Sequence, residues 1–397
     1  MLQLSFVNFK PSSYILVEGT EATDYFFIIQ SGHVKCYNEI PIAGIPPLTL
    51  GPGDFIGVIP CMTGQRQIQN VVSTTPVVAI MVKRAQYPEL IMKNTPVAMK
   101  IVRSFARDMR HINDQLTKLT LNKTNVSTPE QIYAAAEYFE NMGMYMAAAY
   151  GYFQYIRECP SGMNVATAQQ RFGRLKTRAM PPYIEASTDS IRTYPRGAMI
   201  FYECQHGSDM YIIQSGSVRI SKVVAGKEVT LALLKKGDLF GEMALLENLP
   251  RSANAIANEE ARLMVVNKEN FNQMVTTQPQ MISKLTTMFA DRLWTMQRQL
   301  TNTQLRDTRE KLIDMISLQL EKQKIPFSKE TYHTGFTVQD IMNLCVIPQR
   351  DQYQAMQLLQ TDQCVHIVSG RIDVPDVAQL IRQAAFYRKQ NSKHVTD

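Results

Sequence analysis

The chain has 397 residues, a formal net charge of +7, and a composition in which 45% of residues are hydrophobic and 19% are charged. A chain of this length is too long for one compact core and predicts two to four domains, and its composition excludes a wholly disordered protein. The mild positive charge is compatible with nucleic-acid contact without demonstrating it, and the six scattered cysteines include no Cys-x-x-Cys pair, which argues against disulfide and zinc frameworks.

The sequence shows no targeting or membrane segment. Its first residues lack the basic start and long apolar run of a signal peptide. No stretch reaches the roughly 18 uncharged apolar residues that span a bilayer. We therefore expect a cytoplasmic protein that makes no membrane contact.

An internal repeat organises the chain. Phe27–Gly32 recurs as Tyr211–Gly216, with the last five residues identical. Gly53–Gly57 recurs as Gly237–Gly241, and both pairs of motifs are 184 residues apart (211 − 27 and 237 − 53). Two motifs at one offset indicate two copies of one fold with no net insertion between them.

Each copy has the pattern of strands followed by a helix. Short apolar runs broken by Gly, Pro and Asn predict antiparallel strands joined by tight turns. Helical patterns follow at residues 88–119 and 279–305. The expected fold class is α+β multidomain, with two β-barrel or jelly-roll domains that each end in a long helix.

A different composition separates the two copies. Residues 129–175 are rich in Ala, Tyr and Phe at helical spacing, which predicts a helical hairpin because small residues let two helices approach closely. A series of small, aromatic and proline residues in this segment resembles one tetratricopeptide-type repeat. The series is Gly143, Tyr145, Ala148, Tyr152 and Pro160. Since about three such repeats make a stable solenoid, we expect a spacer, with a protein-docking surface as the alternative.

Residues 240–255 of the second copy have the chemistry of an anion site. A cyclic phosphodiester needs a fixed positive charge, backbone N–H donors and an acceptor for its ribose hydroxyl. Arg251 can supply a bidentate fork to the phosphate, and Gly241 allows close backbone approach before a short helical turn. The carboxylate of Glu242 would repel a phosphate, so we assign it as the acceptor for the ribose hydroxyl.

These residues resemble the phosphate-binding cassette of bacterial cAMP receptor proteins and of cAMP-dependent protein kinase regulatory subunits. The shared order is Phe-Gly-Glu-x-Ala-Leu followed by Pro-Arg-x-Ala, and the spacing from Gly241 to Arg251 is that of the kinase subunits. The resemblance implies that Glu242 holds the ribose 2′-hydroxyl and Arg251 the cyclic phosphate, with cAMP favoured as effector, cGMP as the alternative and no other cofactor. The implied ligand-binding set is Gly241, Glu242, Met243, Ala244, Arg251, Ser252 and Ala253.

The first copy has lost this chemistry. At the 184-residue offset, Glu242 aligns with Val58, and Ala244 aligns with Pro60, which lacks an amide donor. Arg66 remains, one residue early. We expect the first domain to keep the fold without binding a cyclic nucleotide, and to serve a structural or partner-docking role.

The helix after the second copy carries a nearly heptad apolar stripe between residues 282 and 300. It resembles the dimerisation helix of the cAMP receptor family, which favours a homodimer, while packing on the chain's own barrel is the alternative. The stripe consists of Ile282, Leu285, Phe289, Leu293, Met296 and Leu300.

The C-terminal segment resembles the DNA-binding domain of the same activator family. Residues 336–359 have the pattern of two short helices around a turn, and residues 365–374 that of a small hairpin, which together predict a winged helix-turn-helix. Residues 348–359 would be the recognition helix. The residues available to DNA are Gln349, Arg350, Gln352 and Gln354, and a basic tail at residues 382–393 can contact phosphates.

Together these patterns predict a cyclic-nucleotide-responsive transcriptional regulator with four parts. They are a degenerate nucleotide-binding-like domain (1–122), a helical spacer (123–185), a cyclic-nucleotide-binding domain (186–305) and a winged helix (306–397). The alternatives are a signalling regulator without DNA binding, resembling a kinase regulatory subunit, and a scaffold that docks proteins. An enzyme is not expected, because the sequence offers no nucleophile–base pair, metal cluster or Walker loop.

Overall fold

The structure is a computed structural model that describes residues 5–39, 41–42, 46–121, 128–177, 189–224, 226–277, 279–345 and 347–393. They form two compact units. Unit 1 comprises residues 1–108 and 275–397, and unit 2 comprises residues 109–274. Within the described residues, no helix combines the length and apolarity required to cross a bilayer.

Unit 1 contains an antiparallel β-sandwich, the first sandwich. One sheet has the order β1-β8-β3-β6 and the other β2-β7-β4-β5. Side chains from both sheets, including Phe27, Ile29, Val34 and Ala79, share one buried core. The strands are β1 (Ser5–Phe9), β2 (Tyr14–Leu16), β3 (Tyr25–Ser31), β4 (Val34–Tyr37), β5 (Leu48–Leu50), β6 (Phe55–Ile56), β7 (Asn70–Ser73) and β8 (Val77–Lys83).

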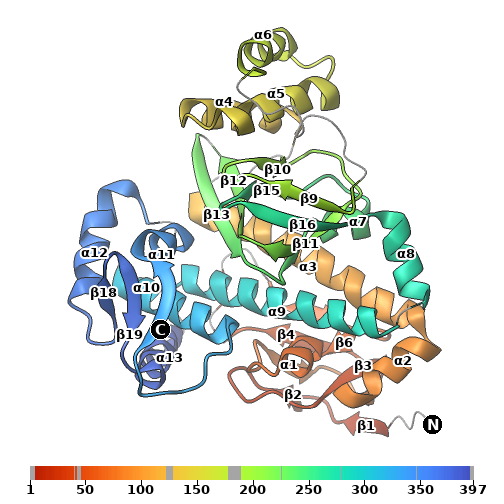
Figure 1. Ribbon diagram of the computed structural model, residues 1–397. Helices are drawn as coiled ribbons and strands as arrows, with labels where there is room; N and C mark the ends of the chain where they lie inside the picture. The colour runs from red at the N-terminus through yellow and green to blue at the C-terminus, as the bar shows by residue number, and fades with distance from the viewer. Residues whose placement is uncertain are drawn as a thin grey trace. The chain divides into compact units, whose positions relative to one another are not determined.

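Unit 2 contains the second sandwich, whose sheets have the orders β14-β11-β16-β9 and β10-β15-β12-β13 (Figure 1). Strand for strand this is the order of the first sandwich, so the predicted repeat of one fold is confirmed. The strands are β9 (Ile191–Tyr194), β10 (Met199–Phe201), β11 (Met210–Ser215), β12 (Val218–Val224), β13 (Lys227–Leu234), β14 (Leu239–Phe240), β15 (Asn254–Ala257) and β16 (Ala261–Val266).

The sequence left two classes open for these domains, a β-barrel and a jelly roll, and the observed sheets do not close into a barrel. Each sheet has four strands and remains open. The buried core of the first sandwich draws residues from both of its sheets. Two open sheets that share a core form a sandwich, whereas closure would require one continuous hydrogen-bonded ring of strands.

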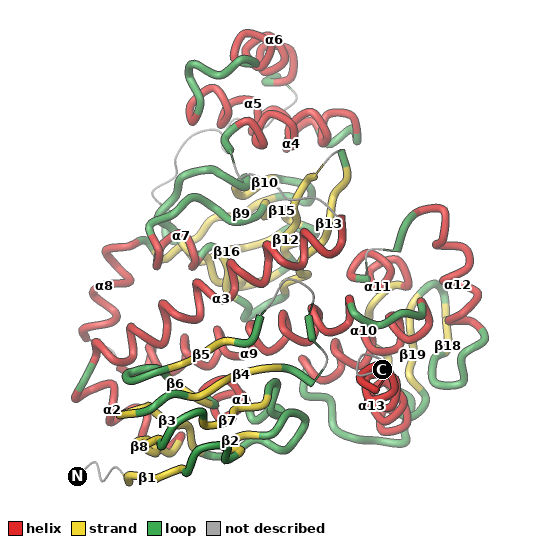
Figure 2. The backbone as a smooth tube through the Cα atoms, turned by 180° about the vertical axis from the view of Figure 1, so that it is seen from behind, coloured by secondary structure: helices red, strands yellow, loops and turns green. Residues whose placement is uncertain are grey.

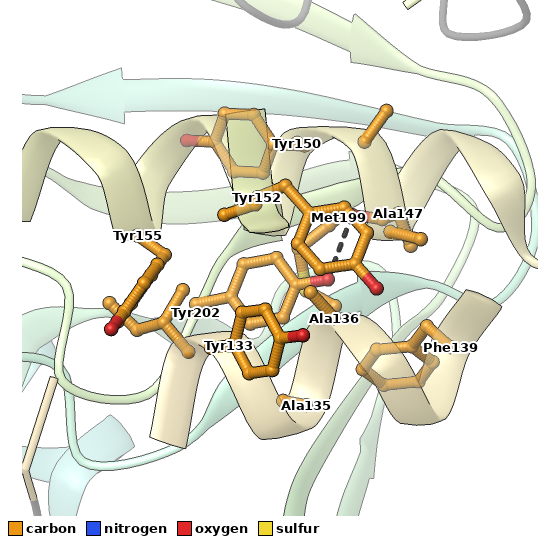
Figure 3. Packing of buried hydrophobic residues seen from close by; sticks show 14 of the residues in the cluster. Tyr133, Ala135, Ala136, Phe139, Ala147, Tyr150, Tyr152, Tyr155, Met199 and Tyr202 are labelled. Atoms are coloured by element: carbon orange, nitrogen blue, oxygen red, sulfur yellow. Dashed lines mark hydrogen bonds between the residues drawn. The ribbon is translucent and has the colours of Figure 1, made fainter. Parts of the chain in front are cut away.

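The described part of residues 123–185, where the sequence predicts a helical hairpin, contains three helices, one more than expected. They are α4 (Glu130–Asn141), α5 (Tyr145–Glu158) and α6 (Val165–Leu175). We call them the helical module. Tyrosines of α4 and α5 pack in its buried core together with Tyr202 from the second sandwich (Figure 3). The predicted close approach of small residues is found here, since Ala136 and Ala148 are fully buried in this core.

The remaining helices of the sandwiches include two short ones that occupy equivalent places. In the first sandwich α1 (Val58–Thr63) follows β6, and in the second α7 (Glu242–Glu247) follows β14. Longer helices come after each sandwich. They are α2 (Tyr87–Lys93), preceded by the 3-10 turn η1 (Arg84–Gln86), and α3 (Thr95–Leu121) after the first, and α8 (Lys268–Thr277) and α9 (Pro279–Thr303) after the second.

Helix α9 packs in unit 1 against α1 and α2 of the first sandwich. Trp294 donates its indole N–H to the carbonyl oxygen of Arg66 at 3.2 Å, and the hydroxyl groups of Tyr87 and Thr286 lie 3.0 Å apart. All six residues of the predicted apolar stripe are buried within the single chain. The face assigned to a homodimer is therefore already covered by the chain itself.

Helix α3 begins in unit 1, and its residues from Met109 onward belong to unit 2. There Arg110 pairs with Glu247 of α7 at 2.7 Å, and Asp114 pairs with the buried Lys222 of β12 at 3.0 Å. The long helix that follows the first sandwich thus contacts the second, just as α9, which follows the second, contacts the first.

The C-terminal part of unit 1 contains a three-stranded antiparallel sheet with the order β17-β19-β18. Figure 2 shows β18 and β19 beside α12. The elements are α10 (Thr308–Lys322), β17 (Tyr332–Thr337), α11 (Val338–Leu344), the 3-10 turn η3 (Gln349–Asp351), α12 (Gln352–Gln360), β18 (His366–Val368), β19 (Arg371–Val374) and α13 (Val377–Lys393).

A buried carboxylate joins α9 to this C-terminal part. Asp314 of α10 is fully buried and forms ion pairs with Arg298 of α9 and Arg388 of α13. It also accepts a hydrogen bond from Asn302 at 3.0 Å. Burial disfavours the charged carboxylate, but the two guanidinium groups outweigh it and hold the pKa of Asp314 below its usual range. Arg388, part of the predicted DNA-contacting tail, is therefore engaged inside the fold.

We predict that Asp314→Asn destabilises unit 1 by about 3–5 kcal/mol, because it removes a fully buried charge that pairs with two half-buried guanidinium groups. Trp294 is the chain's one tryptophan and lies 5.7 Å from the Arg298 guanidinium, so denaturant unfolding followed by tryptophan fluorescence reports on this region. The pKa of Asp314 is lower when folded, so its stabilising effect is complete above the unfolded pKa of about 3.9 and is lost as pH falls through the folded pKa.

The matched control for this prediction is Asp351→Asn, since Asp351 is 43% exposed and pairs with its neighbour Arg350. The control should change the free energy of unfolding by a few tenths of a kcal/mol at most. Equal stability of the two variants at neutral pH would contradict the assigned role of Asp314.

Candidate functional site

The predicted cassette begins where β14 ends. Gly241 has a φ of 80°, in the left-handed region, and caps the start of α7. A Cβ at this position would lie 2.7 Å from Nη1 of Arg251 and 3.1 Å from the carbonyl oxygen of Asp209. Both backbone conformation and space therefore require glycine here. The next residue, Glu242, is fully buried at the first position of α7.

Arg251 lies at the centre of this site and is 5% exposed. Its Nη1 donates to the carbonyl oxygen of Gly241 at 2.7 Å, and its guanidinium carbon stacks 4.2 Å from the ring centroid of Phe201. Its Nε has no hydrogen-bond partner. The Arg251 side chain makes no salt bridge with any residue that the structure describes. The second sandwich thus holds a buried cation that retains a free donor.

The electrostatics of Arg251 follow from this burial. Desolvation lowers the pKa of the guanidinium from its ordinary value, and the nearby Tyr211 and Asp209 offset part of this effect. The carboxylate of Glu242 also favours the charged form of Arg251. Asp209 itself pairs with Arg192 at 3.5 Å, so its charge is shared between two arginines. Arg251 remains cationic, and a bound anion would supply the missing counter-charge.

The structure brings the remaining predicted residues to the same place. Met243 and Ala244 are buried on α7, and Ala253 is buried just before β15. The hydroxyl of Ser252 lies 3.6 Å from the sulfur of Met243. α7 and the segment 251–253 therefore lie side by side, as the cassette prediction requires.

Four residues of the site are absent from the sequence prediction. Phe201 and Tyr211 present their rings to Arg251, at 4.2 and 5.9 Å. The backbone carbonyl of Gln205 accepts a hydrogen bond from the backbone N–H of Arg251 at 2.9 Å. A Cβ on Gly207 would lie 2.7 Å from Nη2 of Arg251. The sequence carries one signal for them, the glycine at position 207 that follows His206.

The equivalent place in the first sandwich keeps the backbone and loses the charge. Cys204 and Gln205 exchange backbone hydrogen bonds with Arg251 in the second sandwich. In the first, Gly19 and Thr20 exchange the same two bonds with Gln67, at 2.8 and 2.9 Å. The structural counterpart of Arg251 is therefore the buried Gln67.

Arg66, the arginine noted in the first copy, serves another purpose. Its side chain is exposed and donates to the carbonyl oxygen of Gly19 at 2.9 Å. The loop around it holds the helices of unit 1, through bonds from Trp294 to the Arg66 carbonyl and from Gln65 to the carbonyl of Glu321. Val58 and Pro60 lie buried in α1, which places two apolar side chains where the second sandwich has Glu242 and Ala244.

The predicted DNA-contacting residues lie on η3 and the start of α12. Gln349, Arg350 and Gln354 are exposed, and the Arg350 side chain is 85% exposed. Gln352 is half-buried, and its Nε2 donates to the carbonyl of Ile347 at 3.5 Å, which ties it to the preceding turn. Val346, which falls within the two short helices and turn predicted for residues 336–359, lies outside the described residues.

Comparison with known proteins identifies both sandwiches. Residues 6–94 and 191–278 match the family model of the cyclic nucleotide-binding domain. A cyclic AMP receptor protein of Thermus thermophilus is 40% identical over 103 residues, which are 26% of this chain and 48% of that protein. A cAMP-dependent protein kinase regulatory subunit of Yarrowia lipolytica is 22% identical over 261 residues, which are 66% of this chain and 51% of that protein.

A solved structure of the Thermus thermophilus catabolite activator protein aligns with 27% identity and a TM-score of 0.27, covering 50% of this chain and 90% of that one. The chain spans about half the length of the first two curated relatives described here. Two of its segments match the family model of the cyclic nucleotide-binding domain, and the chain is similar both to CRP-like cAMP regulators and to kinase regulatory subunits.

Proposed function

We propose that this protein is a cytoplasmic cyclic-nucleotide-responsive transcriptional regulator. The second sandwich binds cAMP, or cGMP as the alternative, and the C-terminal part binds DNA. The observation that carries the proposal is Arg251, a buried guanidinium with a free Nε and no salt bridge to any described residue. A buried cation costs several kcal/mol unless a counter-charge reaches it, and the cyclic phosphate is that counter-charge.

The nucleotide uses the site as follows. The guanidinium of Arg251 presents its donors to the two exocyclic oxygens of the cyclic phosphate. The amides of Met243 and Ala244, at the start of α7, add neutral donors. Glu242, which is fully buried at the first position of α7, accepts the ribose hydroxyl. Ser252 and Ala253 complete the wall.

The proposal for the C-terminal part is a winged helix. Its support is the chain order of a helix, a strand, two short helices and a hairpin, together with the sheet order β17-β19-β18. Gln349, Arg350 and Gln354 then face the DNA, and Gln352 braces the turn. The four-part division at residues 122, 185 and 305 is part of this proposal, with the β-sandwiches ordered as jelly rolls.

Coupling between nucleotide and DNA runs through α8 and α9, which connect the second sandwich to the C-terminal part. The ion pairs of Asp314 with Arg298 and Arg388 make α9, α10 and α13 move together. The nucleotide must bind one helix arrangement better than the other, and a coupling of about 1–3 kcal/mol is sufficient.

The second candidate function is a signalling regulator that binds a protein rather than DNA. One observation favours it, the match to a kinase regulatory subunit across 66% of this chain. In that case the loop around Arg66 would only support the helices of unit 1. The helical module or the first sandwich would bind the partner protein. Nucleotide-dependent capture of a protein, with no effect on DNA mobility, would select this candidate.

We predict that Arg251→Ala weakens cyclic-nucleotide binding by roughly 100-fold, because two charge-assisted hydrogen bonds are lost. Isothermal titration with cAMP, cGMP and cyclic di-GMP measures this and names the preferred ligand. Arg66→Ala is the matched control, since it removes an exposed arginine from the corresponding loop of the first sandwich, and should leave affinity unchanged. Absence of heat with all three nucleotides for the wild-type protein would refute the sensing function.

We predict that Gly207→Ala also weakens binding, by about tenfold, through position rather than charge. The new methyl group would lie 2.7 Å from Nη2 of Arg251 and must displace the guanidinium. Gly226→Ala is the control, because nothing lies within 4 Å of a Cβ there. Gly226 has a φ of 72°, so the control carries backbone strain without touching Arg251. The same titration compares Gly207→Ala with Gly226→Ala. Equal affinities of these two variants would show that the Arg251 guanidinium can shift without loss of binding.

We predict that Arg350→Ala weakens binding to a duplex selected from a random-sequence library in the presence of the bound nucleotide. A base contact would cost about 1–3 kcal/mol and relax specificity at one position. Fluorescence anisotropy at a fixed salt concentration measures both. Arg306→Ala, an exposed arginine before α10, is the control. Selection of no sequence at all would move the assignment to the protein-binding candidate.

A further inference from the structure

The helical module is joined to the nucleotide site by one loop, residues 202–209 of the second sandwich. At its start, Tyr202 is fully buried and enters the core of the module, where its hydroxyl donates to the carbonyl of Ala147 at 2.8 Å (Figure 3). Gly151, in the middle of α5, makes room for it, since a Cβ there would lie 2.7 Å from the Tyr202 hydroxyl. A glycine inside a helix costs up to about 1 kcal/mol, and here the gap is filled by the tyrosine.

The next residues of the loop continue the connection. Gln205 is buried, and its Nε2 donates to the hydroxyl of Tyr150 on α5 at 3.1 Å. Its Oε1 accepts the backbone N–H of Tyr202 at 3.0 Å. His206 then lies 2.6 Å, Nδ1 to Oε2, from Glu158, the last residue of α5. Helix α5 therefore holds the loop at two successive residues.

The same loop holds Arg251 from the other side. The backbone N–H of Arg251 donates to the carbonyl of Gln205 at 2.9 Å, and the backbone N–H of Cys204 donates to the carbonyl of Arg251 at 2.9 Å. Gly207 lies against the guanidinium. Gln205 is thus the shared residue, with its side chain on Tyr150 and its main chain on Arg251.

The first sandwich shows what this loop looks like without the connection. Its backbone makes the same pair of bonds, with Thr20 in the place of Gln205 and Gln67 in the place of Arg251. The hydroxyl of Thr20 donates to Val17 within its own loop at 2.7 Å. The glutamine-to-tyrosine link is therefore not required by the sandwich, and it occurs where the arginine occurs.

We propose that the helical module is a positioning element of the nucleotide site, with Tyr150 acting through Gln205 to hold Arg251 in place for the phosphate of a cyclic nucleotide. This inference rests on the proposed function of the second sandwich. By reciprocity, a nucleotide that fixes Arg251 also strengthens the docking of α5 on the loop. A protein that displaces the module would therefore release the nucleotide.

The test compares two tyrosines of α5 that differ in what they hold. Tyr150→Phe removes the hydroxyl that accepts from Gln205. Tyr152→Phe removes a hydroxyl that contacts only Glu140 and Arg171, both within the module. Titration with cAMP should show affinity about two- to thirtyfold weaker for Tyr150→Phe and unchanged for Tyr152→Phe, although both lower the melting temperature.

Two further measurements test whether a loss of affinity comes from unfolding, and whether the nucleotide in turn stabilises α5. His206→Ala breaks the other contact at a side chain that is 73% exposed, so folding is not threatened, and affinity should weaken in the same direction by a smaller factor. Hydrogen exchange of the α5 amides should slow when cAMP is added to the wild type, and this protection should disappear in Tyr150→Phe.

The outcomes separate the inference from the function on which it rests. If the wild type binds cAMP and both tyrosine variants keep its affinity, or both lose it equally, the positioning role is overturned while the sensor stands. If the wild type binds no cyclic nucleotide, the sensing function fails, and the positioning role falls with it.

Discussion

The structure depends above all on keeping the Arg251 guanidinium charged inside the second sandwich. A buried guanidinium costs several kcal/mol unless its hydrogen bonds and charge are matched. The protein satisfies it in part, with the Gly241 carbonyl and the face of Phe201, and leaves Nε without a partner. A carboxylate in direct contact with Arg251 would neutralise its charge and occupy its remaining donor, and the site would then be lost. The incomplete pairing is therefore the feature of the site on which the proposed binding of an anion rests.

The first sandwich shows which features belong to the fold and which belong to the site. It retains a left-handed glycine before α1, Gly57, and the backbone bonds around Gln67. The same backbone bonds form around a glutamine there, so the fold itself does not require an arginine. The loop after α1 supports helices α9 and α10 through Gln65 and the Arg66 carbonyl. The two copies thus share a backbone frame and differ in the charge that it holds.

Buried polar links connect these parts more specifically than apolar packing does. Asp314 requires Arg298 and Arg388 together, and Gln205 requires both Tyr150 and Arg251. Apolar contacts tolerate small shifts, whereas a buried hydrogen bond is lost within about half an ångström of misplacement. Elements that share such a link are held to one another in a fixed position, in unit 1 around Asp314 and in unit 2 around Gln205.

The sequence by itself determined the repeat, and it named the cassette residues, because both depend on short-range spacing: Gly241 must have a positive φ, and α7 must follow it directly. Tertiary structure decided what long-range pairing controls. Open sheets decided between the two expected classes, barrel and jelly roll, and a third helix joined the hairpin. The stacking of Phe201 and the link through Gln205 join segments about 50 residues apart in sequence, and no local pattern encodes which of them will meet.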